Sequence, residues 1–200
     1  MSIFRWTAPL FKLWGRRWTD EDFRQLAGWL RPYVSEGGVI ADLGGGTGEL
    51  GAGIAYELGA RAVIVDPTVQ MLQRVDAKPW VSVRRAPAES LPFPDGYFDA
   101  LVCCDSFHHF ADQDAAVREI ARVVRPGGGL ALLEMDPAGR DRFWAALERL
   151  LGEPASFRSP EDLQRFLAAH GIDGTAKRER SSGYSFVGTV GPRPAEDGGD

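Results

Sequence analysis

The chain has 200 residues, is 44% apolar and 26% charged, and carries a formal net charge of −5. These values are ordinary for a globular protein with one core, and they exclude collagen, a coiled coil or disorder of the whole chain. The acidic balance disfavours a general nucleic-acid binder, and no apolar run reaches the roughly 18 residues of a membrane-spanning helix.

The cysteines and the amino terminus favour a reducing compartment. Cys103 and Cys104 are adjacent, and neighbours in a strand point to opposite faces, so no disulfide is expected between them. The first 18 residues are interrupted by Pro9 and lack the small-residue cleavage site of a secretory signal. We therefore expect a cytoplasmic protein.

Apolar periodicity and turn residues predict alternating helices and strands. A helix is expected after Thr19, because Thr19 and Asp22 have capping-box spacing. Core strands are predicted at residues 39–43, 61–66, 81–86, 99–104 and 129–135. Further helices are predicted at residues 49–58, 69–75, 117–124, 143–151 and 160–170. A closing hairpin is predicted from strands at residues 175–180 and 184–190.

This order predicts an α/β, Rossmann-like, doubly wound and mostly parallel sheet of about seven strands, with an antiparallel C-terminal hairpin. We expect one domain at residues 1–190, made of an N-terminal helical lid or cap (1–37) and a core (38–190), followed by a disordered tail at 191–200. Three tryptophans and four basic residues but no acid lie in the first 18 residues. This composition suits a lid over an apolar substrate, a segment packed on the core or, less well, contact with a membrane surface.

The first core strand leads directly into a glycine-rich turn, DLGGGTGE at residues 42–49. In such sheets ligands bind beyond the carboxyl ends of the strands, and glycines let a ligand approach the backbone. One candidate ligand is a nicotinamide dinucleotide, because Gly46, Gly48 and Gly51 formally satisfy GxGxxG and Asp66 lies 20 positions after Gly46. Asp66 ends the second strand, where its carboxylate would accept hydrogen bonds from the ribose of any adenosine ligand.

The other candidate ligand is S-adenosylmethionine, whose acid-x-GxGxG pattern is matched by Asp42, Gly44, Gly46 and Gly48. If the strand ends just before Gly44, the third glycine of the dinucleotide pattern is replaced by Glu49. Asp42 and Glu49 would repel a pyrophosphate at this helix N-terminus, whereas they attract the sulfonium and ammonium of S-adenosylmethionine. Strand register and charge therefore favour S-adenosylmethionine.

Four blocks in chain order carry a resemblance to a known family: ADLGGGTG (41–48), VDPTVQML (65–72), AESLPFPDGYFDALVCCDSFHHF (88–110) and RVVRPGGGL (122–130). Together they are similar to the class I S-adenosylmethionine-dependent methyltransferases, in particular the small-molecule branch that includes ubiquinone/menaquinone methyltransferases. The resemblance implies methyl transfer from S-adenosylmethionine to a small-molecule acceptor, with S-adenosylhomocysteine as product.

The resemblance also implies cofactor-binding residues. Asp42 through Gly48, with Gly44 and Gly46 among them, would hold the methionyl part, and Asp66 would hold the ribose hydroxyls. The other implied contacts are Pro67 and Met71 beside the adenine, the backbone N–H of Ala88 on the adenine ring, and Cys104 near the sulfonium.

Two positions depart from the family pattern. Before Ala88 the family usually has an acid that accepts a hydrogen bond from the adenine amino group, whereas this chain has Pro87. Upstream, the family's YDxxAPxYD pattern retains only Ala8-Pro9. These departures leave open a second class of function, a cofactor-binding module without transferase activity, beside the nicotinamide-dependent oxidoreductase.

Methyl transfer needs a general base only if the acceptor must lose a proton. Candidates beyond the fourth and fifth core strands are Asp105, His108, His109, Glu134 and Asp136. Because an imidazole titrates near neutral pH, we take His109 as the candidate catalytic residue and expect His108 to be packed, with one of the two rings capping the following helix. The cysteines are expected to be buried rather than nucleophilic, and neither a metal site nor a nucleic-acid partner is predicted.

Overall fold

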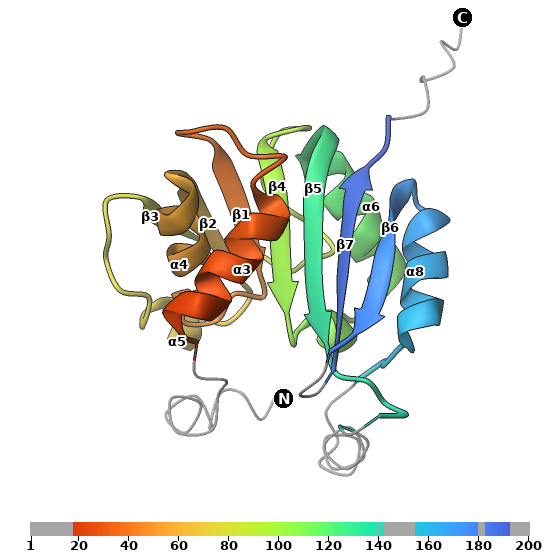
Figure 1. Cartoon of the computed structure of the whole chain (residues 1–200). Helices are drawn as coiled ribbons and strands as arrows, with labels where there is room; N and C mark the ends of the chain where they lie inside the picture. Colours follow the sequence, from red (N-terminus) through yellow and green to blue (C-terminus); the bar gives the residue numbers. More distant parts are fainter. Residues whose placement is uncertain (1–17, 140, 142–154, 180–182, 193–200) are drawn as a thin grey trace, which may run out of the picture.

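The computed structural model describes residues 18–139, 141, 155–179 and 183–192 (Figure 1). Within these residues the strands form one seven-stranded sheet in the order β3-β2-β1-β4-β5-β7-β6. The strands are β1 (Val39–Leu43), β2 (Arg61–Asp66), β3 (Val81–Arg85), β4 (Phe98–Cys104), β5 (Val124–Glu134), β6 (Ile172–Arg178) and β7 (Tyr184–Val190). The helices are α3 (Asp20–Leu30), α4 (Glu49–Leu58), α5 (Val69–Leu72), the short 3₁₀ helix η1 (Phe107–His109), α6 (Gln113–Val123) and α8 (Pro160–Ala168).

The strand order explains where a ligand can bind. β1 pairs in parallel with β2 on one side and β4 on the other, so the chain changes direction across the sheet at β1. Such a reversal leaves a crevice beyond the carboxyl ends of the strands. In Figure 1 the arrowhead of β4 marks this edge, at the bottom of the view. At the end of the strand order that is farthest from β3, β7 runs antiparallel to both β5 and β6. This confirms the predicted hairpin.

Local sequence explains the helix boundaries. The Thr19 hydroxyl accepts a hydrogen bond from the Asp22 amide, while the Asp22 carboxylate accepts one from the Thr19 amide. This is a complete capping box, and such a cap contributes about 1 kcal/mol. Ser159 caps α8 in a similar way, and Pro160 occupies its first helical position. None of the helices in the described ranges is long and apolar enough to cross a membrane.

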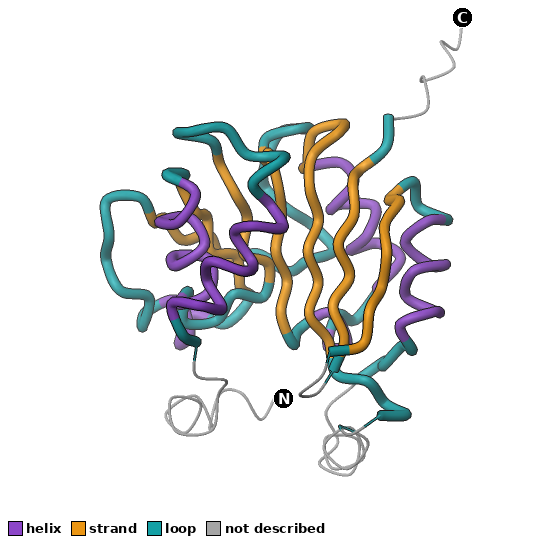
Figure 2. Tube along the Cα trace, in the orientation of Figure 1, coloured by secondary structure: helices purple, strands orange, loops and turns teal. Residues whose placement is uncertain are grey.

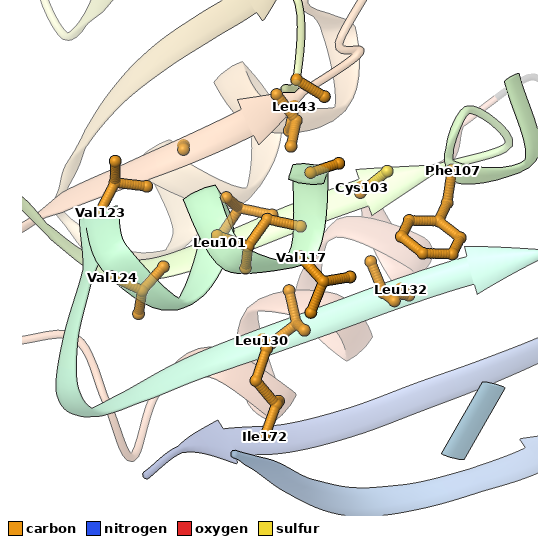
Figure 3. Close-up of a cluster of buried hydrophobic side chains, with 14 of the residues drawn as sticks. Leu43, Leu101, Cys103, Phe107, Val117, Val123, Val124, Leu130, Leu132 and Ile172 are labelled. Atoms are coloured by element: carbon orange, nitrogen blue, oxygen red, sulfur yellow. The ribbon is translucent and has the colours of Figure 1, made fainter. Parts of the chain in front are cut away.

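Helices cover both faces of the sheet (Figure 2). On one face, α3 and α4 pack with residues such as Leu30 and Ile54 against the inner strands. On the other face, α6 and α8 pack on a second cluster of buried side chains. Figure 3 shows part of this second cluster, with Val117 of α6 beside Leu101 of β4 and Leu130 of β5. The doubly wound arrangement predicted from the sequence is therefore confirmed.

Several predicted boundaries were wrong. β5 begins at Val124 rather than at residue 129, because Phe98 pairs with Val124 and Ala100 with Gly129 across a register shift. This irregularity accommodates Pro126, which has no N–H for a ladder. Helix α5 is one turn long and stops well before residue 75, while β6 starts three residues earlier than predicted.

Some predictions lie outside the described residues. These are the helix at 143–151, residues 1–17 of the proposed lid or cap, and most of the tail at 191–200. The division into a cap and a core therefore stays a prediction.

The contact between α3 and α4 depends on a glycine. A Cβ at Gly53 of α4 would lie 2.5 Å from the Phe23 ring of α3. We expect Gly53→Ala to lower the free energy of unfolding by about 1–3 kcal/mol, the usual cost of overpacking. Gly28→Ala is the control, because that glycine is exposed in α3 with open space around the added methyl, and it should stabilise by about 0.5–1 kcal/mol. Urea unfolding followed by circular dichroism measures both, and equal stabilisation by the two variants would contradict the packing described.

Candidate active site

The glycine turn between β1 and α4 has backbone angles that residues with a side chain adopt only with strain. Gly44, Gly46 and Gly48 have φ values of 69°, 54° and 75°, in the left-handed region that glycine adopts at little cost. Gly48 is the N-cap of α4, and the Gly44 amide donates to the Val65 carbonyl at 2.7 Å. The strand ends at Leu43 and the helix begins at Glu49, as the S-adenosylmethionine interpretation required.

Asp42 is a carboxylate buried against this turn. It is 1% exposed, and its Oδ2 accepts a hydrogen bond from the Gly51 amide at 2.9 Å. A Cβ at Gly45 or Gly51 would lie within 2.6 Å of the Asp42 side chain, so both glycines are needed to make room for it. Burial raises the pKa of Asp42 to about 7, the Gly51 hydrogen bond opposes this, and the charge of Asp66 adds to it.

Asp66 faces the same turn from the end of β2. Its Oδ2 accepts from the Gly46 amide at 3.1 Å and its Oδ1 from the Thr68 amide at 2.7 Å. Burial raises the pKa of Asp66, although both amide hydrogen bonds lower it. The carboxylate is thus oriented by the backbone, with lone pairs left for a ligand because each oxygen can accept more than one hydrogen bond.

These residues open into a cavity of about 810 Å³, within the range of about 300–1,000 Å³ that is common for ligand pockets. The cavity takes in the glycine turn, the first turns of α4, the segment after β2 and the segment after β4. Acids predominate around the turn itself, where Asp42, Glu49 and Asp66 all line the wall. A site of this kind attracts a ligand that carries positive charge.

The structure brings most of the predicted cofactor residues together. Those that line the cavity are Asp42, Gly44, Gly46, Gly48, Asp66, Pro67, Met71 and Cys104. Ala88 is buried, 3% exposed, and is not among the lining residues. The role of its amide, and the effect of Pro87 beside it, stay predictions.

The candidate bases separate into two groups. Asp105 and His109 line the cavity, whereas His108, Glu134 and Asp136 are buried and do not. Asp105 has a φ of 47°, the only positive value for a residue other than glycine among the residues described. Such strain is found most often at functional sites.

Two expectations about the segment after β4 have clear outcomes. The helix after η1 is capped by the Asp112 side chain, which accepts from the Ala115 amide, so the expectation that a histidine ring caps it was wrong. Cys103 is fully buried, and its burial raises the pKa of the thiol well above the ordinary value. A neutral, buried thiol is not a nucleophile, so the expectation of burial is confirmed for Cys103, whereas Cys104 is only partly buried and lines the cavity.

Sequence reasoning placed Trp18 in a possible lid but missed other wall residues, notably Phe23, Ser106 and Phe110. Trp18 and Phe23 stack on each other, with ring centroids 6.4 Å apart, at the start of α3. The Phe23 ring lies against Gly53 of α4, where a Cβ would not fit, and the sequence alone does not place Gly53 beside α3. Ser106 and Phe110 fall within the block after β4, and their residue types alone do not indicate a cavity wall.

The chain is similar to known methyltransferases in sequence and in structure. Residues 41–132 match the family model described as a methyltransferase domain. The ubiquinone/menaquinone biosynthesis C-methyltransferase of Chromobacterium violaceum is 37% identical over 108 residues, which are 50% of this chain and 44% of that protein. The corresponding protein of Nitrosospira multiformis is 27% identical over 84% of this chain and 68% of its own length.

A solved structure extends the likeness in fold over nearly the whole chain. It is the complex between the Haloferax volcanii Trm112 methyltransferase activator and a methyltransferase. The matched chain of that complex has a TM-score of 0.77 and 16% sequence identity, and the match covers 96% of this chain and 99% of that chain. The chain spans less than half the length of several of the curated relatives it matches. Residues 41–132 thus match a methyltransferase domain, and the chain resembles the class I, S-adenosylmethionine-dependent ubiquinone/menaquinone C-methyltransferases.

Proposed function

We propose that the protein binds S-adenosylmethionine in this cavity and catalyses transfer of its methyl group to a small-molecule acceptor. The observation that carries the proposal is the pair of buried carboxylates, Asp42 and Asp66, held by amides of the glycine turn and of α4. S-adenosylmethionine brings two positive groups and a ribose diol to such a wall. A dinucleotide would instead bring its pyrophosphate against Asp42 and Glu49, which like charge disfavours.

The residues have distinct roles in this proposal. Asp66 would accept hydrogen bonds from the ribose hydroxyls, and the turn at 44–48 would hold the methionyl part. Cys104, at the carboxyl end of β4, would lie near the sulfonium. When bound, the cofactor supplies an electrophilic methyl group that moves from sulfur to the acceptor, leaving S-adenosylhomocysteine. His109 accepts the proton of acceptors that must lose one. Positioning and exclusion of water provide the rest of the acceleration.

The acceptor in this proposal is small and partly apolar. Trp18, Phe23 and Phe110 provide aromatic surface in the cavity wall, which suits an apolar molecule better than a polar polymer. Because Trp18 and Phe23 belong to residues 1–37, they also support the proposed role of that segment as a cap. We propose neither a nucleic-acid partner nor membrane insertion.

Calorimetry with the reaction product and with a dinucleotide tests the proposed ligand. We expect S-adenosylhomocysteine to bind the purified chain and NADH to give no heat of binding, because the acidic turn repels a pyrophosphate. Asp66→Asn should weaken the binding of S-adenosylhomocysteine about tenfold, since it removes a charge-assisted hydrogen bond to the ribose. Binding of NADH alone would contradict the proposal.

The raised pKa of Asp42 gives a pH dependence that can be checked. Because the pKa rises on folding from 3.8 to about 7, folding favours the protonated carboxyl. The resulting contribution to stability is complete below pH 3.8 and is lost as the pH rises through about 7. Asp42→Asn keeps an acceptor for the Gly51 amide without the charge. From pH 4 to pH 7 the unfolding free energy of the wild type should therefore fall relative to that of Asp42→Asn.

The same variant separates stability from binding. Wild-type affinity for S-adenosylhomocysteine should increase from pH 6 to pH 8 as Asp42 ionises and attracts the ligand's ammonium, whereas Asp42→Asn should bind weakly at every pH. Urea titrations and calorimetry at several pH values measure the two effects. A parallel pH dependence in both proteins would show that Asp42 is not the group responsible.

A further inference from the structure

Glu134 is the last residue of β5, and both of its carboxylate oxygens accept hydrogen bonds from the segment that follows β4. Its Oε1 accepts from the Ser106 amide at 3.2 Å and from the Phe107 amide at 2.8 Å. Its Oε2 accepts from Nδ1 of His108 at 2.5 Å. Glu134 is 4% exposed and does not line the cavity. A carboxylate with these three donors holds a loop rather than receiving a proton from an acceptor.

Ser106 extends this contact to the glycine turn. Its hydroxyl donates a hydrogen bond at 3.2 Å to the carbonyl of Leu43, which is the last residue of β1. The hydroxyl also lies so close to Gly44 that a Cβ on that glycine would be 2.1 Å away. Because Gly44 begins the turn and lines the cavity, the position of Ser106 limits where the backbone of the turn can lie.

His108 carries the other part of the contact to the cavity wall. Its ring stacks on Phe157, with centroids 4.5 Å apart, and lies 4.0 Å from the ring of His109. The His109 amide donates to the Ser106 carbonyl at 3.0 Å, and His109 lines the cavity. The ring of His108 thus supports the ring that faces a ligand.

We infer that Glu134 is a positioning residue of the cofactor site, which acts through Ser106 on the glycine turn and through His108 on the wall that carries His109. The inference rests on the proposed function, because it concerns the site proposed for S-adenosylmethionine. Three strand ends are joined in this way: β5 through Glu134, β4 through the segment that follows it, and β1 through Leu43. Neither Glu134 nor His108 touches the ligand in this account.

Three variants test the inference by calorimetry with S-adenosylhomocysteine. Glu134→Gln keeps one oxygen for the two amides but presents an NH₂ group to His108. Ser106→Ala removes the hydroxyl that contacts the Leu43 carbonyl and Cys103 Sγ. Each should weaken binding about tenfold, the effect of one lost hydrogen bond. Asp99→Asn is the matched control, since Asp99 holds the Val39 amide at 2.9 Å at the amino ends of the strands, and it should lower stability while changing affinity by less than about twofold.

A spectroscopic signature separates positioning from a loss of stability. The chain has three histidines, so the ring nitrogens can be assigned by ¹⁵N NMR. In the wild type Nδ1 of His108 should carry the proton that is donated to Glu134. In Glu134→Gln the proton should move to Nε2, because the amide group is a donor, whereas Ser106→Ala and Asp99→Asn should leave the ring signals unchanged.

The outcomes are distinct. Weaker binding in Glu134→Gln and Ser106→Ala, with an unaffected Asp99→Asn, supports the inference. If the wild type binds S-adenosylhomocysteine and these two variants bind it equally well, the inference is wrong while the proposed function stands. If the wild type does not bind it, the proposed function fails and the inference fails with it. Should Glu134→Gln not fold, Ser106→Ala still tests the link to the glycine turn, because it removes a single hydroxyl, and unchanged binding by that variant would contradict the inference.

Discussion

The burial of the Asp42 carboxyl group against the glycine turn is the constraint on which the site depends. An ionised carboxylate out of contact with water costs free energy unless donors or a cation compensate it. Here one amide, from Gly51 in α4, provides the direct hydrogen bond that the structure shows. The remaining cost is expressed in a pKa raised to about 7. A cationic ligand would offset that cost, so its binding would favour the ionised form of Asp42.

The rest of the fold serves to keep this arrangement in register. Parallel pairing aligns Asp42 with Ile64 and Leu43 with Val65, which brings Asp66 to the same edge of the sheet as the turn. The Gly46 amide then connects turn and carboxylate directly. Across β4, the contacts of Glu134 fix the other wall. Backbone amides hydrogen-bond to the carboxylates of Asp42 and Asp66, and this gives a site that is largely formed before ligand binding.

Much of this could be predicted because the signals are local. The bounds of β1, α4 and β2 follow from buried apolar runs and from glycines at the turn and at residue 59, and the structure reproduces them. The acid-and-glycine pattern of the turn likewise needs only residues close in the chain. The charge argument for the ligand required no knowledge of the other strands.

The rest could not be predicted because it depends on contacts between distant segments. Glu134 and Ser106 are 28 residues apart, and nothing in the sequence indicates that one holds the amide of the other. The early start of β5 results from a register shift against β4, which periodicity cannot reveal. Ala88 was assigned to the site through resemblance alone, and the cavity of this chain does not include it.

A crystal structure of the full chain with S-adenosylhomocysteine tests the central claim most directly. The account predicts density in the cavity at the glycine turn, with the ribose hydroxyls at hydrogen-bond distance from Asp66 and the ligand's ammonium on the side of Asp42. It also predicts that the side chains of Glu134 and His108 stay in contact with each other and not with the ligand. Density for the ligand elsewhere, or with its ammonium turned away from Asp42, would contradict the account.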